Sequence, residues 1–389
     1  MLAGIALVAL TLRSAATAVS PLLDAVRADI GVTTTALGIL GLLAPACFSV
    51  FGAITPALGR RLGLERALVL SLAVTAVGSL TRPLAGGTTL FLVLSAVTLA
   101  GMAMGNVLLP PIVKRYFPDR IGSVTGFYVV LIAVSAALPP YVALPLADAL
   151  GWQASLASWG LVAVVAVLPW LGLSSGGRGG VLLGGGGLPV HRSRRAWGLT
   201  AMFGMTALNV YTLFVWLPDI LTSAGVATES AVGLLGLYAA MGIPATVVVP
   251  VVAARMADPF PLIVLFAAFF WAGYLGLLVA PTAYTWLWVV LAGLGPATFP
   301  ISIAAINLRT ATEAGSGSLS GMVQGIGYAV AVLGPLGFGL LHDTTGSWTG
   351  PQLLLVGSVV FMLAGGWSGL RPGPVEEDLG WELAADAGR

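Results

Sequence analysis

The feature that most constrains this fold is a set of apolar segments, each about 20 residues long, recurring along almost the whole chain. At about 1.5 Å of rise per residue, a helix of that length crosses the roughly 30 Å hydrocarbon core of a bilayer. Only 8% of the residues are charged, far below the roughly 25% of a soluble domain. We identify twelve segments, at 2–23, 35–57, 65–81, 89–112, 122–147, 153–172, 197–218, 231–253, 261–280, 284–307, 317–341 and 351–370.

These segments are continuously apolar, whereas the strands of a transmembrane barrel alternate in polarity over roughly 10 residues. Backbone groups in hydrocarbon find no water to bond, so helices remain as the spanning structure. The sequence therefore predicts an all-α integral membrane fold with twelve transmembrane helices.

The basic residues indicate the orientation of these helices. Fourteen of the 17 Lys and Arg residues fall in alternate loops and the C-terminal tail, two (Arg27 and Arg82) fall in the other loops, and the last is Arg13. Cytoplasmic loops carry the excess of basic residues, so we expect both termini in the cytoplasm.

A Gly-rich, basic stretch, SSGGRGGVLLGGGGLPVHRSRR, separates the first six segments from the last six. Its composition is typical of a flexible linker. We predict a six-helix bundle at 1–173, a cytoplasmic linker at 174–196, a second six-helix bundle at 197–371 and an acidic cytoplasmic tail at 372–389. The tail, acidic from Glu376 to Asp386, is typical of a solvated, unstructured end.

The two halves of the chain also match each other. SPLLD at 20–24 matches LPDIL at 217–221, LPP at 138–140 matches GPL at 334–336, and Gly151-Trp152 matches Ser347-Trp348. The offsets are 197, 196 and 196 residues, which indicates a parallel duplication of a six-helix unit. Duplicated carriers of this kind bind their solute between the halves, near the bilayer midplane.

One arginine, Arg13, lies roughly midway through the first segment. A charge at that depth costs about 2.5 to 3.5 kcal/mol on insertion scales, and no acidic residue lies at similar depth in the sequence. Arg13 is then either the anchor of an anionic or strongly dipolar ligand, or an arginine satisfied by backbone carbonyls that fixes the packing of a broken helix. We favour the first interpretation because intramembrane charges in bundles usually line pathways.

Other polar residues within the segments are few, which favours a small ligand over a sugar. We predict that they form a ring of hydrogen-bonding groups around Arg13, although each could instead join two helices. They are Thr17, Asn106, Tyr128, Asn209, Tyr211, Gln324 and Tyr328.

Charged and titratable residues near the ends of the segments are candidates for gating or coupling: Asp24, Arg61, Lys114, Arg309 and His342. With no carboxylate at the midplane, we expect a uniporter or exchanger, or proton movement with the solute or through Asp24 or His342. No cluster of His, Cys, Asp or Glu gathers in the sequence, so we predict neither an enzyme nor a metal or cofactor site.

Several stretches resemble the cyanate permease and 2-nitroimidazole transporter family of the major facilitator superfamily. They are GNVLLP at 105–110 with KRYFP at 114–118, the run LSGMVQGIGYAVAVLGPLGFGLLHDTTGSW at 319–348, and Leu12-Arg13 followed by Pro21-Leu22-Leu23. Thr11 stands where that family often has Asn. The loop after the second segment is similar to the superfamily signature, with Pro56 and Arg60 in place of its usual Gly and Asp.

The resemblance implies a monomeric, multi-pass carrier of the bacterial inner membrane that moves a small anionic or dipolar solute, such as cyanate, nitrate, a small carboxylate or a nitroimidazole. Its partners would be that solute and the lipid bilayer, with no nucleic acid and no cofactor. Two alternatives remain open: efflux of neutral lipophilic drugs, which would tolerate loss of Arg13, and a receptor that binds its ligand without moving it.

Overall fold

The computed structural model describes residues 1–174, 188–253, 256 and 258–380, and this part of the chain contains helices and no strand. The chain folds as two compact units. Unit 1 comprises residues 1–188 and 312–321, and unit 2 comprises residues 189–311 and 322–389. Most of the predicted linker, residues 175–187, lies outside the described residues.

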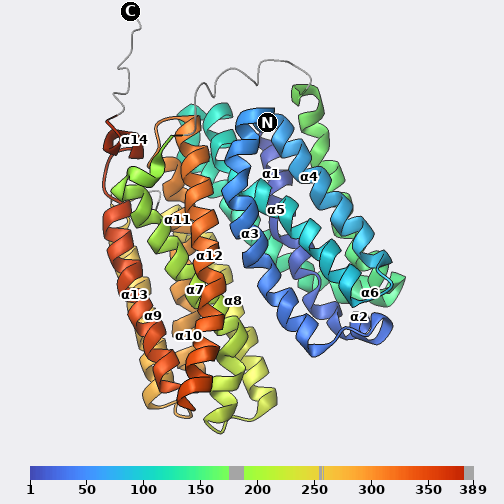
Figure 1. The fold of residues 1–389 in the computed structure, drawn as a ribbon, viewed down its shortest axis with the longest axis vertical. Coiled ribbons are helices and arrows are strands. Elements are labelled where there is room, and N and C mark those ends of the chain that lie inside the picture. Colours follow the sequence, from blue (N-terminus) through green and yellow to red (C-terminus); the bar gives the residue numbers. More distant parts are fainter. Residues whose placement is uncertain (175–187, 254–255, 257, 381–389) are drawn as a thin grey trace, which may run out of the picture. The chain divides into compact units, whose positions relative to one another are not determined.

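Unit 1 contains the first six predicted segments (Figure 1). Its helices are α1 (Leu2–Thr17), α2 (Leu23–Ile30), α3 (Thr34–Leu62), α4 (Leu64–Thr81), α5 (Thr88–Tyr116) and α6 (Ile121–Ser174). Helix α6 contains two predicted segments, which are separated by a kink at Gly151. The φ of Gly151 is 86°, a value that only glycine adopts easily. Gly63, with the same φ, separates α3 from α4. Helix α1 packs on α5 and α6, and α4 lies against the same two helices.

Unit 2 contains the remaining six segments. Its helices are α7 (Arg194–Ser223), α8 (Thr228–Ala253), α9 (Phe260–Val279), α10 (Thr285–Leu294), α11 (Thr298–Leu308), α12 (Glu313–Thr345), α13 (Thr349–Gly369) and the short α14 (Val375–Asp378). The first residues of α12, up to Gly321, belong to unit 1. Among the described residues, ten helical stretches are long and apolar enough to cross a membrane, with α6 counted once and α10 and α11 counted together.

Helices α7 and α13 approach each other closely in unit 2 because small residues line their contact. A Cβ added at Gly365 would lie 2.7 Å from the Gly198 carbonyl oxygen and 2.7 Å from the Met202 nitrogen. Such backbone contact between helices is typical of membrane proteins, where small residues replace the hydrophobic effect as the source of tight packing.

The first predicted segment is broken, and its break has a chemical cause. Pro21 has no N–H to bond the carbonyl of Thr17, where α1 ends. The backbone N–H groups that follow donate to the carbonyls of residues 14 and 16, so they pass over the Ala15 carbonyl. Nη2 of Arg82 donates to this Ala15 oxygen at 2.8 Å. Arg82 therefore completes the hydrogen bonding of the broken helix end.

The burial of Arg82 differs from our expectation of a loop residue. Its side chain is 1% exposed, and its guanidinium lies 5.8 Å from the ring centroid of Phe91. In the described part of the chain no carboxylate pairs with it. A carbonyl dipole and an aromatic face thus replace water around this charge.

The acidic tail also differs from our expectation, because its first part is ordered. Glu376 is 1% exposed and accepts the backbone N–H of Ala311 at 3.0 Å. Arg195 pairs with Glu377 at 3.2 Å and with Asp378 at 3.1 Å. These carboxylates attach α14 to unit 2, and residues 381–389 lie outside the described part of the chain.

The close contact between α7 and α13 gives a first prediction. Gly365→Val should destabilise the protein by about 1–3 kcal/mol, because the added carbons would overlap backbone atoms that cannot move aside. Gly357→Val is the matched control on the same helix, since no atom lies within 4 Å of its Cβ position. Thermal unfolding in detergent should show a lower Tm for the first variant alone, and equal shifts would contradict this packing.

The bond to Ala15 gives a second prediction. Arg82→Leu removes a charged donor, and such a hydrogen bond is worth about 1.5–3 kcal/mol. Hydrogen–deuterium exchange of the peptide covering residues 15–22 should therefore accelerate by about tenfold or more. Peptides from α9 serve as the internal reference. Unchanged exchange at the break would show that Arg82 does not stabilise it.

Candidate substrate site

Arg13 lies one turn before the end of α1 and is half-buried. Its Nη1 donates to the Leu12 carbonyl at 3.1 Å, and its guanidinium carbon lies 4.7 Å from the ring centroid of Phe48 on α3. A cation over a ring face gains about 0.5–1 kcal/mol when exposed and about 2 kcal/mol when desolvated. The ring thus holds the charge in place while part of the side chain stays accessible.

Thr17 lies one turn after Arg13 on the same face of α1, as its spacing predicts. Its hydroxyl lies 3.2 Å from the Arg13 carbonyl oxygen and 3.3 Å from the Ser14 carbonyl oxygen, to which it donates. The Thr17 proton is therefore committed within the helix, and the hydroxyl oxygen retains acceptor capacity toward a ligand.

Two further candidates in unit 1 are deeply buried. Asn106 on α5 is 7% exposed, and its Nδ2 donates to the Met102 carbonyl at 3.3 Å. Tyr128 on α6 is 1% exposed, and its hydroxyl has no hydrogen-bond partner among the described residues. A buried polar group left unsatisfied costs about 1–3 kcal/mol, so the Tyr128 hydroxyl calls for a water or ligand partner.

Asn209 in unit 2 joins three helices. The hydroxyl of Tyr274 on α9 donates to its Oδ1 at 2.8 Å, and its Nδ2 lies 2.8 Å from the hydroxyl oxygen of Ser358 on α13. Its Nδ2 also donates to the Met205 carbonyl at 2.7 Å. The side chain is 0% exposed. This arrangement matches the alternative in which a polar residue links helices.

Tyr211 and Tyr328 come together in an aromatic cluster of unit 2. Their ring centroids lie 6.4 Å apart at an interplanar angle of 71°. Tyr328 also packs edge-on against Phe203 at 5.1 Å and lies 6.3 Å from Phe299. Gln324 lies one turn before Tyr328 on α12, and both are 1% exposed. The cluster presents ring edges and faces of the kind that contact planar molecules.

The gating candidates lie at helix ends. Asp24 is in the first turn of α2, Arg61 in the last turn of α3, Lys114 in the last turn of α5, Arg309 just after α11 and His342 in the last turn of α12. Nη2 of Arg309 donates to the Leu370 carbonyl at 2.7 Å and so ties α11 to the end of α13. Burial, together with the nearby charge of Arg195, lowers the pKa of Arg309.

The sequence did not reveal an ion-pair cluster in unit 1. Nη1 of Arg115 donates to Glu65 at 2.8 Å, the hydroxyl of Tyr116 donates to the same Glu65 oxygen at 2.9 Å, and Nε of Arg115 donates to Glu313 at 2.7 Å. The loop before Glu65 lacks the acid of the superfamily signature, at Arg60. Glu65, five residues later, supplies a carboxylate near that position.

Comparison with known proteins agrees with the fold and the motifs. The sequence model of the family named Major Facilitator Superfamily matches residues 5–335 of this chain. The chain is 33% identical over 364 residues to the 2-nitroimidazole transporter of Escherichia coli (strain K12), covering 91% of each protein. It is 27% identical over 379 residues to the cyanate transport protein CynX of the same strain, covering 93% of this chain and 96% of the relative.

A solved structure gives the same result for the fold alone. The proton:xylose symporter XylE aligns with a TM-score of 0.73 at 13% identity, covering 98% of both chains. The resemblance that the residues in 12–23, 105–118 and 319–348 indicated is confirmed. The chain therefore belongs to the major facilitator superfamily of membrane transporters.

Proposed function

We propose that this transporter moves a small anionic or dipolar solute across the bacterial inner membrane by alternating access, with Arg13 as its charge anchor. The observation that carries the proposal is the placement of Arg13, a half-buried guanidinium on an otherwise apolar helix, held by the Phe48 ring and the Leu12 carbonyl. A cation kept at such a position, at a cost of a few kcal/mol, is expected to serve a ligand.

The geometry of the guanidinium favours a compact, planar acceptor. Arginine presents its donors in a rigid fork that can bond two oxygens at once, and this suits cyanate, nitrate, carboxylate or nitro groups. The other polar candidates are few, which limits the number of hydrogen bonds that a solute could receive. In this proposal Asn106, Tyr128, Tyr211, Gln324 and Tyr328 orient the solute.

Asn209 takes a supporting role in this proposal. Its amide already bonds Tyr274, Ser358 and Met205, so it has little capacity left for a solute. Its function would be to hold α7, α9 and α13 together behind the aromatic cluster that contains Tyr328.

The names of the relatives support the same class of solute. Cyanate is a small anion, and 2-nitroimidazole is a planar ring with a strongly dipolar nitro group. An arginine fork suits both, and the cluster of Tyr211, Tyr328, Phe203 and Phe299 suits a planar ring. The same cluster favours the second candidate, efflux of neutral lipophilic compounds, in which Arg13 would be structural.

The charge pattern supports an orientation with both termini in the cytoplasm. Four of the described acidic residues, Asp24, Glu65, Glu229 and Glu313, lie in the first turns of helices, and Asp219 lies near the end of α7. Coupling through a carboxylate deep within a helix therefore has no support from them. We propose uniport or exchange, or a proton that moves with the solute or through Asp24 or His342.

A ligand screen on Arg13 variants tests the central assignment. The purified protein is heated with cyanate, nitrate, acetate or 2-nitroimidazole, because a ligand of the folded state raises the Tm. One of these probes should stabilise the wild type. Arg13→Gln should weaken its binding about tenfold to 150-fold, the equivalent of one charged hydrogen bond at about 1.5–3 kcal/mol. Arg13→Lys should retain part of the affinity, since it keeps the charge without the fork.

Arg27→Gln is the matched control, because Arg27 is an exposed arginine of the same unit. It should bind the probe as the wild type does. Counterflow of the labelled probe in proteoliposomes then separates a carrier from a receptor, since a receptor would bind without exchange. Equal stabilisation of wild type and Arg13→Gln by neutral lipophilic compounds, with no response to anions, would reject the proposal and favour drug efflux.

A further inference from the structure

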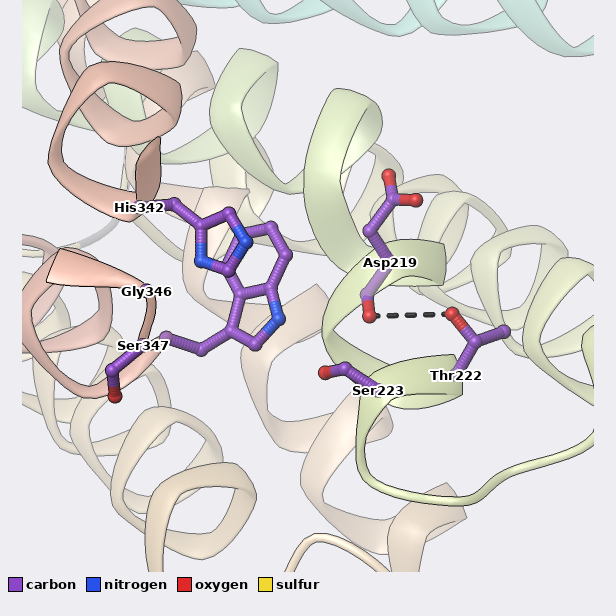
Figure 2. A pocket seen from close by; sticks show the side chains of 7 residues that line it. Asp219, Thr222, Ser223, His342, Gly346 and Ser347 are labelled. Carbon is purple, nitrogen blue, oxygen red and sulfur yellow. Dashed lines mark hydrogen bonds between the residues drawn. The ribbon is translucent and has the colours of Figure 1, made fainter. Parts of the chain in front are cut away.

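Unit 2 contains a cavity of about 680 Å³ that is widely open at its surface, at the end of the unit where α7 and α12 finish. Figure 2 shows Asp219, Thr222 and Ser223 of α7 on one side and His342, Gly346 and Ser347 on the other. The complete lining is Asp219, Thr222, Ser223, His342, Gly346, Ser347 and Trp348. Small-molecule sites have volumes of roughly 300–1,000 Å³, so the cavity is of a size that holds a ligand.

The α7 side of the cavity is rich in acceptors. Asp219 forms no ion pair, and its carboxylate has no hydrogen bond to any described residue. The Thr222 hydroxyl donates toward the Pro218 carbonyl at 3.0 Å and the Asp219 carbonyl at 3.3 Å, the second of which Figure 2 shows, and the Ser223 hydroxyl donates to the Ile220 carbonyl at 2.8 Å. Because both protons point to the backbone, the hydroxyl oxygens remain as acceptors. This side therefore offers a full negative charge and neutral acceptors, which suits a cation.

The other side of the cavity is a fixed aromatic wall. The imidazole of His342 stacks on the indole of Trp348 with centroids 3.7 Å apart and an interplanar angle of 10°. Phe338 and Trp216 pack against the same indole, at 5.7 Å and 5.8 Å. Rings packed in this way lose little freedom when a ligand binds, so the wall is already organised.

The internal repeat shows that this cavity is not a necessary feature of the fold. Trp152 in unit 1 matches Trp348 in unit 2 at an offset of 196 residues. The indole of Trp152 donates to the Asp29 carboxylate at 3.1 Å, Gln153 donates to the same oxygen at 3.0 Å, and Trp152 is 8% exposed within a hydrophobic core. We call the region around Trp152 the corner of unit 1, and this corner is closed by the Asp29 carboxylate, which accepts from the tryptophan.

The same corner of unit 2 lacks this closure. The offset of 197 at the neighbouring match of Pro21 with Pro218 places Val226 where unit 1 has Asp29. The indole N–H of Trp348 donates no hydrogen bond to the described residues, and the carboxylate of this region, Asp219, belongs to an exposed residue of the cavity lining and has no partner among them. In unit 1 the Asp29 carboxylate is used to bond a tryptophan, whereas in unit 2 the Asp219 carboxylate remains available to a ligand.

We infer that this cavity is a second binding site, separate from Arg13, for a small organic cation with N–H donors, such as an amidinium or a protonated aromatic amine. Asp219 would supply the opposite charge, and the hydroxyl oxygens of Thr222 and Ser223 would accept hydrogen bonds. A metal ion fits less well, because no group of three His, Cys, Asp or Glu side chains gathers anywhere in the described residues. The ligand proposed here is a cation, whereas the solute proposed at Arg13 is anionic or dipolar. All residues of this second site belong to unit 2.

Binding of two probes of the same shape and opposite charge tests this inference. Benzamidinium and benzoate are titrated into the full-length protein in nanodiscs of neutral lipid by calorimetry. Benzamidinium should bind at one site per protein, and benzoate should bind there at least tenfold more weakly. Asp219→Asn should weaken benzamidinium binding by about tenfold or more, because a charge-assisted hydrogen bond is lost. Asp343→Asn, which removes an exposed carboxylate next to His342 that lies outside the cavity lining, should change the affinity less than twofold.

Three results would overturn the inference: no benzamidinium binding at millimolar concentration, equal binding of benzoate at this site, or equal losses in the Asp219 and Asp343 variants. The comparison of the two probes on the wild type decides the charge preference even if Asp219→Asn fails to fold. Arg13→Gln should leave benzamidinium binding unchanged. The inference and the proposed function can therefore fail separately, since each is read from a different probe and a different residue.

Discussion

The structure depends on one constraint: in hydrocarbon, every backbone polar group must find its partner within the protein. Unbroken helices meet this constraint by themselves, and each break needs a side chain or a special residue. Arg82 donates to the Ala15 carbonyl, which the backbone hydrogen bonds at the end of α1 pass over. In unit 2 the indole of Trp216 donates to the carbonyl of Pro335 at 2.9 Å, inside α12, which continues past this proline. The breaks and bends of the helices are thus tied to particular polar side chains, which are buried for that reason.

The same constraint separates the two arginines of unit 1 that lie near the break. Arg82 is 1% exposed and its bond to Ala15 joins two segments, so its charge serves the backbone. Arg13 is half-buried, and the partner described for it on another helix is the ring of Phe48, which attracts a cation without neutralising it. Part of the Arg13 side chain stays accessible, so its charge can attract an anion. This contrast is the physical reason for assigning ligand binding to Arg13 and a structural role to Arg82.

The sequence predicted the helical segments because length and apolar composition are local properties that the bilayer imposes on each span. It did not predict partners that lie far apart in the chain. Glu65 and Arg115 are separated by 50 residues, Asn209 and Ser358 by 149, and Arg82 and Ala15 by 67. Local patterns carry no information about such pairs, so neither the burial of Arg82 nor the particular helices that Asn209 joins could be predicted. The ordering of Glu376 was missed for the same reason, since its partner is the backbone N–H of Ala311. For the candidate site, the sequence identified Arg13 through its cost in the membrane, whereas Phe48 needed the structure.

The internal repeat shows how such long-range pairs create differences between two copies of one architecture. A duplicated chain begins with the same helices and the same tryptophan at the end of each unit, and packing alone would preserve both corners. In unit 1, Asp29 accepts from Trp152 and Gln153, and the corner joins the core. In unit 2 the position of Asp29 is Val226, so no carboxylate there can accept from the indole of Trp348. Stacking by His342 then fixes the indole from another direction, and the stability of the corner no longer requires a carboxylate. Because no described packing contact uses the exposed Asp219 carboxylate, its charge stays available to a cation bound in the cavity that it lines.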